Sequence, residues 1–139
     1  MPDARHVGRR YEATGQVVDA DRARRFALAL AGADPVAEPD SVPPTYAAVY
    51  CLFPTLGQLF LDPDADINLA GLVHGEQAFT WPVPIRPGDV VDSVATIASV
   101  EEKRGMTFVG IDIEAKRQGD GATVCTGRSL MIIRGATNG

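Results

Sequence analysis

Histidine and cysteine are scarce in this chain of 139 residues, which contains two of each. His6 and His74 lie far apart in the sequence, and neither Cys51 nor Cys125 belongs to a C-x-x-C pair. This spacing matches no zinc or iron–sulfur motif and no disulfide framework. We therefore expect no metal ion, two reduced cysteines and a cytoplasmic location.

Basic residues are also few. Lys and Arg total 13 against 18 Asp and Glu, which gives a formal net charge of −5. Nucleic-acid binding needs a concentrated basic face, which these residues do not form in the sequence, so we expect no nucleic-acid partner. The sequence has no Walker A loop, no G-x-G-x-x-G and no G-x-S-x-G, so we expect no cofactor.

Apolar runs of membrane-spanning length are absent. Residues 1–10 are basic, but no apolar stretch follows them, so we expect no signal peptide. The segment Thr45–Leu61 carries no charge, yet it is limited in length and contains proline, glycine and glutamine. It predicts a buried core helix, kinked or ended near Pro54, rather than a membrane span. Pro44 suits the first position of such a helix, where its missing N–H is not needed.

The N-terminal half also predicts a strand and an earlier helix. Alternation over Tyr11–Val18 indicates a short strand. Asp19 can cap a helix over Ala20–Ala31, whose apolar residues follow the spacing of one buried stripe. The proline-rich stretch Asp34–Pro44 predicts a loop, and Asp62–Leu72 predicts a polar connector.

The C-terminal half predicts a sheet. Within Leu72–Asp89, the alternation of Gln77–Trp81 indicates a strand, and the prolines after it force an extended run into a turn. Three further strands are predicted, with hairpin turns between them: Val90–Val100, Met106–Gln118 and Ala122–Arg134, with turns at Glu101–Gly105 and Gly119–Gly121. A charge-free helix followed by such strands predicts one α+β domain over 1–139, with an antiparallel sheet curled around the helix. We expect edge strands rich in Val and Ile that pair with another subunit.

Two stretches resemble a known family. Residues 74–89 contain H-G-E-Q, then a phenylalanine, then P-I-R-P-G-D before a predicted strand. This order resembles the FAS1-like dehydratase domain, which is the N-terminal-type domain of MaoC-like dehydratases. Pro43-Pro44-Thr45-Tyr46 resembles the P-P-T-F that opens the core helix in that family. The resemblance implies a hot-dog fold, pairing of two such domains into a double hot-dog dimer, and acyl-CoA or acyl carrier protein (ACP) thioesters as ligands.

The catalytic motif of the family is missing from this chain. In MaoC-like hydratases, D-x-N-P-x-H supplies an aspartate and a histidine that together activate a water. The corresponding run begins at Gly32 and ends at Ala37, so that neither position can move a proton. Asp34 lies between them, before a proline, and we interpret it as a turn residue. We therefore assign no catalytic residue.

His74 is the remaining acid–base candidate, because its intrinsic pKa suits proton transfer. It could line a thioester channel, or it could hold a turn at Gly75 through hydrogen bonds, and we favour the second role. We interpret Glu76 and Gln77 as structural for the same reason. His6 lies in a terminal segment, where we expect it to be solvated.

Binding residues are expected around the core helix. The N–H groups of Thr45 and Tyr46 could polarise a thioester carbonyl, or they could belong to a plain helix start. Apolar residues of the helix could line an acyl tunnel, although we favour a simple core role for them: Val49, Tyr50, Cys51, Phe53 and Leu56. CoA or carrier phosphates could meet Arg86, Lys103 and Arg104, or these could be solvated turn charges.

These observations lead to one functional hypothesis with two alternatives. The chain is a non-catalytic, acyl-accommodating subunit of a heteromeric (R)-specific enoyl thioester hydratase or 3-hydroxyacyl thioester dehydratase, whose MaoC-like catalytic hot-dog partner supplies Asp and His in a heterodimer or heterotetramer. The alternatives are a self-sufficient homodimeric hydratase that uses His74 or Asp34, and a non-enzymatic acyl thioester-binding module. A thioesterase is disfavoured because Thr45–Leu61 offers no carboxylate.

Overall fold

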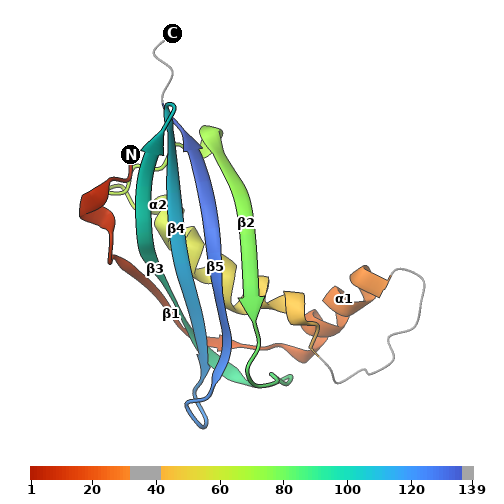
Figure 1. Ribbon diagram of the computed structural model, residues 1–139. Coiled ribbons are helices and arrows are strands. Elements are labelled where there is room, and N and C mark those ends of the chain that lie inside the picture. Colours follow the sequence, from red (N-terminus) through yellow and green to blue (C-terminus); the bar gives the residue numbers. More distant parts are fainter. Residues whose placement is uncertain (32–41, 136–139) are drawn as a thin grey trace.

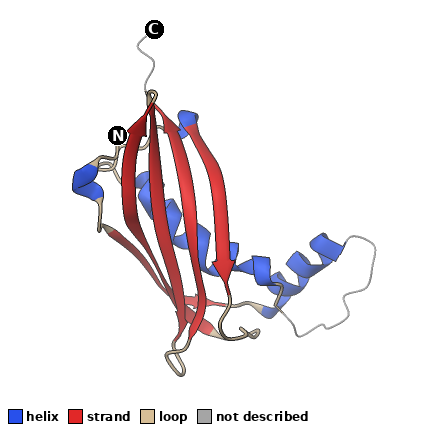
Figure 2. Ribbon diagram, in the orientation of Figure 1, coloured by secondary structure: helices blue, strands red, loops and turns tan. Residues whose placement is uncertain are grey.

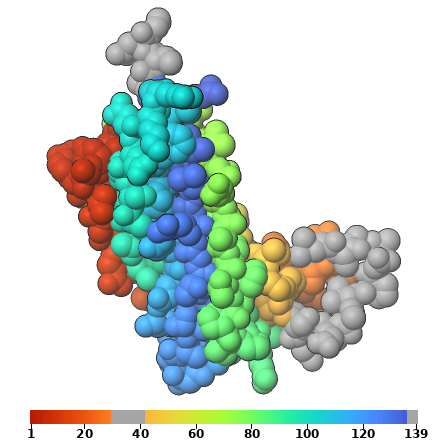
Figure 3. Space-filling view, in the orientation of Figure 1, coloured from red at the N-terminus to blue at the C-terminus, as the bar shows by residue number. Residues whose placement is uncertain are grey.

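The computed structural model describes residues 1–31 and 42–135. One antiparallel sheet of five strands has the order β1-β3-β4-β5-β2, and helix α2 lies along one face of it (Figures 1 and 2). The strands are β1 (Arg10–Val17), β2 (Leu72–Thr80), β3 (Val90–Lys103), β4 (Met106–Arg117) and β5 (Thr123–Arg134), and the α-helices are α1 (Ala20–Ala31) and α2 (Phe53–Leu61). Figure 3 shows the opposite, outer face of the sheet toward the viewer.

The core forms because apolar side chains of the three long strands alternate toward α2. Ile97 of β3 lies opposite Ile111 of β4, and Val109 of β4 lies opposite Met131 of β5. Each of these side chains is almost completely buried, together with Leu59 of α2. Burying one such side chain stabilises the fold by about 1.5–3 kcal/mol, so this alternation alone fixes which face of the sheet meets the helix.

The uncharged segment is helical but not one regular helix. A 3-10 turn at Pro44–Tyr46 is followed by a π-helical turn at Ala48–Leu52 and then by α2. Pro54 lies in the first turn of α2 and has no N–H to give to the carbonyl of Tyr50, four residues earlier. That carbonyl instead accepts a hydrogen bond from the buried hydroxyl of Ser93 on β3, at 2.9 Å. The irregularity predicted near Pro54 therefore extends upstream, because the chain re-pairs its carbonyls with the sheet.

The expectation of edge strands rich in Val and Ile is wrong. The sheet places those strands, β3 to β5, inside, and its edges are β1 and β2. The free side of β1 is partly covered, because Gln58 of α2 donates to the Glu12 carbonyl at 2.6 Å. β2 pairs with β5 on one side and with no described strand on the other.

Two boundaries also differ from the sequence-based ones. β2 begins at Leu72, five residues before Gln77, because Leu72, Val73 and His74 already pair with β5. β3 runs on to Lys103, so the first hairpin turn is only Arg104 and Gly105. Both turn residues have positive φ, at 54° and 76°, which suits the twist of a tight two-residue hairpin.

His6 is buried rather than solvated, with 1% of its side chain exposed. Its Nδ1 accepts a hydrogen bond from the backbone N–H of Asp3 at 3.0 Å. This leaves the ring proton on Nε2, which donates to the carbonyl of Asp64 at 3.1 Å. Both ring nitrogens are therefore engaged in holding the N-terminal segment against the connector that follows α2.

Side chains strengthen the same junction. The carboxylate of Asp62 accepts from the Tyr11 hydroxyl at 2.7 Å and from Arg9 at 3.1 Å, and Arg9 also contacts Asp64 at 2.6 Å. The Tyr11 hydrogen bond, the Asp64 N–H and Arg9 hold the pKa of Asp62 below its ordinary value. Asp62 thus links β1 to the exit of α2.

We expect Asp62→Asn to lower stability in a pH-dependent way. A carboxyl whose pKa is lower in the folded chain contributes fully above its unfolded pKa of about 3.9, and this contribution is lost as the pH falls through the folded pKa. The variant should therefore be less stable than the wild type at pH 7 in urea unfolding, and the difference should shrink below about pH 4. Glu102→Gln, at an exposed position of β3, is the control and should show no such difference. A gap that persists unchanged at pH 2 would contradict this role.

Gly127 keeps β2 close to β5. A Cβ at Gly127 would collide with the carbonyl oxygen of Ala78 on β2 and lie 3.2 Å from side-chain atoms of Ile113 and Phe79. We expect Gly127→Ala to lower the free energy of unfolding by about 2–3 kcal/mol, measured by urea denaturation, because backbone must move. At Gly119, in the β4–β5 turn, a Cβ would meet no atom within 4 Å, so Gly119→Ala should change stability by less than about 0.5 kcal/mol. Equal effects of the two substitutions would refute the close-contact explanation.

Candidate functional site

Tyr50 is the polar residue at the centre of the candidate site. It comes from the π-helical turn, and the bond from Ser93 to its carbonyl fixes its backbone. Only 2% of its surface is exposed, and its hydroxyl has no hydrogen-bond partner within the described part of the chain. The thiols of Cys125 and Cys51 and the indole of Trp81 surround the hydroxyl.

The surroundings keep Tyr50 protonated. Burial raises the pKa of its hydroxyl above the ordinary value, and the two neighbouring thiols raise it further. The contact with Cys125, together with burial, also raises the pKa of the Cys51 thiol. The hydroxyl is therefore a neutral donor in an apolar environment at any physiological pH. A buried polar group without a partner costs about 1–3 kcal/mol, so its persistence points to a ligand atom that completes it.

A row of aromatic rings leads from α1 to Tyr50. Phe26 of α1 meets Tyr46 edge to face, with ring centroids 5.3 Å apart, and the Tyr46 and Tyr50 centroids are 6.3 Å apart. The structure thus brings together three of the predicted binding residues, Tyr46, Tyr50 and Cys51, all of them buried.

Other residues predicted on the core helix lie differently. Leu56 is 2% exposed and belongs to the core, as favoured, and Val49 is half-buried against it. Phe53 is 66% exposed, so it lines no tunnel within this protomer. Thr45 is exposed, and the N–H of Tyr46 already donates to the Pro43 carbonyl at 2.9 Å.

His74 lies away from this centre. It is exposed on β2, opposite Met131 of β5. Tyr50 instead contacts Trp81, which is seven residues after His74, a separation of about 20 Å at the rise of a strand. Its Nε2 is 3.0 Å from the side-chain oxygen of Gln77, in line with the structural roles predicted for both. Gly75 makes a β-bulge rather than the predicted turn, and a Cβ there would lie 2.9 Å from Ile132 Cδ1.

The three predicted phosphate ligands do not meet. Arg86 lies in the turn before β3, while Lys103 and Arg104 lie at the other end of that strand, about 40 Å away at the rise of a strand. Lys103 is also paired with Glu101 at 3.3 Å. The positions that correspond to the catalytic motif, including Gly32, Asp34 and Ala37, lie outside the described residues.

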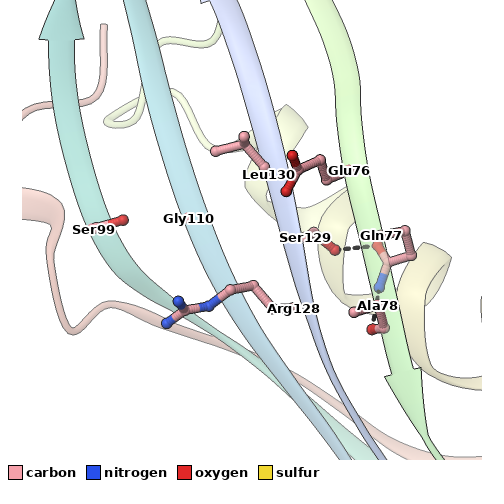
Figure 4. A pocket seen from close by; sticks show the side chains of 8 residues that line it. All are labelled: Glu76, Gln77, Ala78, Ser99, Gly110, Arg128, Ser129 and Leu130. Atoms are coloured by element: carbon pink, nitrogen blue, oxygen red, sulfur yellow. Dashed lines mark hydrogen bonds between the residues drawn. The ribbon is translucent and has the colours of Figure 1, made fainter.

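A hollow of about 590 Å³ lies on the outer face of the sheet, away from Tyr50. Figure 4 shows its lining, which is Glu76, Gln77, Ala78, Ser99, Gly110, Arg128, Ser129 and Leu130. The hollow exists because small residues of neighbouring strands, such as Ala78 and Gly110, leave space between longer side chains. Arg128 extends across β4, where Asp112 pairs with it at 3.0 Å, and the Ser129 hydroxyl donates to Gln77. Because its cation is already paired, this surface offers no evident chemistry.

The described residues have neither a metal site nor a membrane-spanning helix. Across residues 1–31 and 42–135, no three His, Cys, Asp or Glu side chains are placed to hold a metal ion. None of the helices in these ranges combines the length and the apolar character needed to cross a bilayer.

The family follows from a comparison with known sequences. Residues 5–126 match the model of the FAS1-like dehydratase domain region. The chain belongs to this family. Among relatives of the FAS1-like dehydratase chain, a UPF0336 protein of Clavibacter michiganensis is 32% identical over 129 residues, which cover 86% of each chain.

Solved structures agree on the fold. The C-terminally truncated HadBC complex, a (3R)-hydroxyacyl-ACP dehydratase of Mycobacterium tuberculosis, contains a chain similar to this one, with a TM-score of 0.73 and 20% identity over 91% of this chain and 96% of that one. A MaoC-like dehydratase gives a TM-score of 0.75 and 16% identity, but this chain covers only 43% of it. The FAS1-like dehydratase chain therefore has the predicted hot-dog fold, with the sheet wrapped around a helix.

Sequence reasoning missed Ser93, Trp81 and Cys125 as neighbours of Tyr50. Alternation along β3 and β5 could have placed Ser93 and Cys125 on the face that meets the helix. No local signal indicates that they meet the same tyrosine, because that depends on how strands far apart in sequence are paired.

We expect Tyr50→Phe not to destabilise the chain, because the substitution removes a buried hydroxyl that has no described partner. The free energy of unfolding should stay within about 0.5 kcal/mol of the wild type or rise. Tyr11→Phe is the matched control: it removes a hydroxyl that donates to Asp62, and it should cost about 1–2 kcal/mol. Urea denaturation of both variants tests this, and a loss for Tyr50→Phe as large as that for Tyr11→Phe would mean that its hydroxyl is already satisfied.

Proposed function

We propose that this chain is the non-catalytic, acyl-accommodating subunit of a cytoplasmic, heteromeric (R)-specific enoyl thioester hydratase or 3-hydroxyacyl thioester dehydratase. A MaoC-like hot-dog partner supplies the catalytic aspartate and histidine. This chain supplies part of the wall around the acyl thioester and a hydrogen-bond donor within it. Membership of the FAS1-like dehydratase family supports the reaction class.

The single observation that carries the proposal is the unpaired hydroxyl of Tyr50. Its neighbours are two buried thiols and an indole, so the hydroxyl faces an environment suited to an acyl group and not to bulk water. A carbonyl oxygen of the bound acyl thioester is the acceptor that would satisfy it. A neutral donor can stabilise the negative charge that develops on such an oxygen as water adds to the conjugated double bond.

The acid–base chemistry must come from elsewhere. Hydration places OH on C3 and a proton on C2 of the enoyl group, which requires a base for the water and an acid for the carbon. Gly32 and Ala37 stand at the motif positions that would carry these groups. Both histidines are engaged in hydrogen bonds at other places, His6 at the N-terminal junction and His74 on β2.

The free side of β2 is the place at which we expect the partner. Alternate residues of β2 direct their backbone N–H and C=O groups to the side away from β5, and edges of this kind pair with other chains. Val73 and Trp81 remain 54% and 39% exposed along the strand and just after it. Pairing there would give a double hot-dog, and the HadBC complex is an assembly of this family type that supports heteromeric pairing.

The test is hydration of short and long trans-2-enoyl-CoA, followed by loss of the conjugated thioester absorbance. We expect the chain alone to stay at the level of the blank. The complex that co-purifies with it should contain a subunit with D-x-N-P-x-H and should turn the substrates over. Within that complex, Tyr50→Phe should lower kcat/KM by about ten-fold, equivalent to one hydrogen bond of roughly 1.4 kcal/mol.

His74→Ala in the same complex is the control and should leave kcat/KM unchanged. Turnover by the chain alone that His74→Ala abolishes would establish a self-sufficient homodimer instead. Tight binding of acyl thioesters, with no hydratase partner and no turnover in any preparation, would establish a binding module.

A further inference from the structure

A cleft of about 380 Å³ lies between α1 and the irregular helical segment that leads into α2. It is lined by Arg22, Arg25, Phe26, Tyr46 and Val49. All five residues belong to this chain, so the cleft needs no partner to form. Its size falls within the range of small-molecule sites.

The rim of the cleft is basic. Arg22 and Arg25 are three residues apart on α1, which places them on neighbouring positions of one helix face. Both are exposed, and neither forms an ion pair with a carboxylate of the described residues. Nearby acids are Asp19, whose carboxylate accepts from the Arg22 N–H at 2.8 Å, and Asp21 in the first turn. In a chain of net charge −5, two guanidinium groups side by side are a local site for an anion.

The floor of the cleft is apolar. Phe26 packs edge to face on Tyr46, and Val49 lies partly buried one helical turn further on. A simple inorganic anion gains nothing from such a floor. A ligand that fits both parts carries a phosphate at one end and an apolar portion next to it.

The cleft lies next to the candidate acyl site. Tyr46 forms part of its wall, and the ring of Tyr46 is 6.3 Å from that of Tyr50, centroid to centroid. From the surface inward, the chain therefore offers the two arginines, an apolar floor and, behind the buried ring of Tyr46, the unpaired hydroxyl. This is the order of groups in a thioester arm, with phosphate first, a branched apolar portion next and the acyl thioester at the end.

We propose that the Arg22–Arg25 cleft binds the phosphate of the 4′-phosphopantetheine arm that carries the acyl group. The inference rests on the proposed function and adds the point at which the carrier enters. The planar guanidinium groups can each give paired hydrogen bonds to phosphate oxygens, which a lysine cannot do. CoA and acyl carrier protein share this arm, so both carriers are recognised by the same two residues.

The experiment is calorimetric titration of the chain with 4′-phosphopantetheine, CoA, dephospho-CoA and pantetheine. We expect Arg22→Ala and Arg25→Ala each to weaken binding of the three phosphorylated ligands by about five-fold, the effect of losing one exposed charge pair. Pantetheine, which has no phosphate, should bind the variants and the wild type equally. Arg24→Ala removes an exposed arginine of α1 that does not line the cleft, so it should leave all four affinities unchanged.

Three results would overturn the proposal. An equal loss of affinity in Arg24→Ala would show a general charge effect. A loss of affinity confined to CoA would assign the site to the 3′-phosphate of CoA. Unchanged affinities in Arg25→Ala would show that the cleft does not bind these ligands. Unchanged thermal unfolding midpoints confirm that the variants fold. Acyl-pantetheine separates this inference from the proposed function: if Tyr50→Phe still weakens its binding while the arginine variants bind every phosphorylated ligand normally, only the cleft assignment fails.

Discussion

The hydrogen bond from Ser93 to the carbonyl of Tyr50 is the interaction on which the site depends. It exists because Pro54 cannot supply the N–H that an α-helix would give to that carbonyl. The segment before Pro54 forms a π-helical turn, and Ser93 of β3 donates to the carbonyl that the proline cannot pair. The helical segment is thus bonded to β3 at the residue whose side chain forms the centre of the candidate site.

This arrangement places a polar group where the fold alone would not need one. A phenylalanine at position 50 would fill the same space among Cys51, Cys125 and Trp81 without leaving a buried donor unpaired. Burial and the two thiols keep the hydroxyl neutral, and none of the described residues forms a hydrogen bond with it. Such a donor is useful only when an acceptor arrives from outside the chain, which is a property of a binding wall and not of a core.

The sequence predicts the regular parts of this fold and fails where distant segments meet. Helix Ala20–Ala31 and the alternation of β3 to β5 follow from local spacing, and both are confirmed. The order of strands depends on pairing between distant segments, so local spacing does not identify β1 and β2 as the edges of the sheet. His6 is buried against the connector around Asp64, 58 residues away, and nothing in its own part of the sequence indicates this contact, so the prediction of a solvated side chain is wrong. For the candidate site, residue types indicated Tyr46, Tyr50 and Cys51, but the phosphate ligands expected from turn charges lie at opposite ends of β3.

The distribution of charge bears on how the proposed non-catalytic subunit would select its ligand. Ion pairs at Asp62 and at Arg117, with Asp89 and Asp120, join parts of the chain to one another and so serve the fold. Arg22 and Arg25 have no such role among the described residues, and they line the cleft next to the row of aromatic rings that ends at Tyr50. Binding energy gained at a remote phosphate can orient a thioester before any proton moves. In the proposed assembly, a subunit that supplies this orientation would leave its partner to supply the acid and the base.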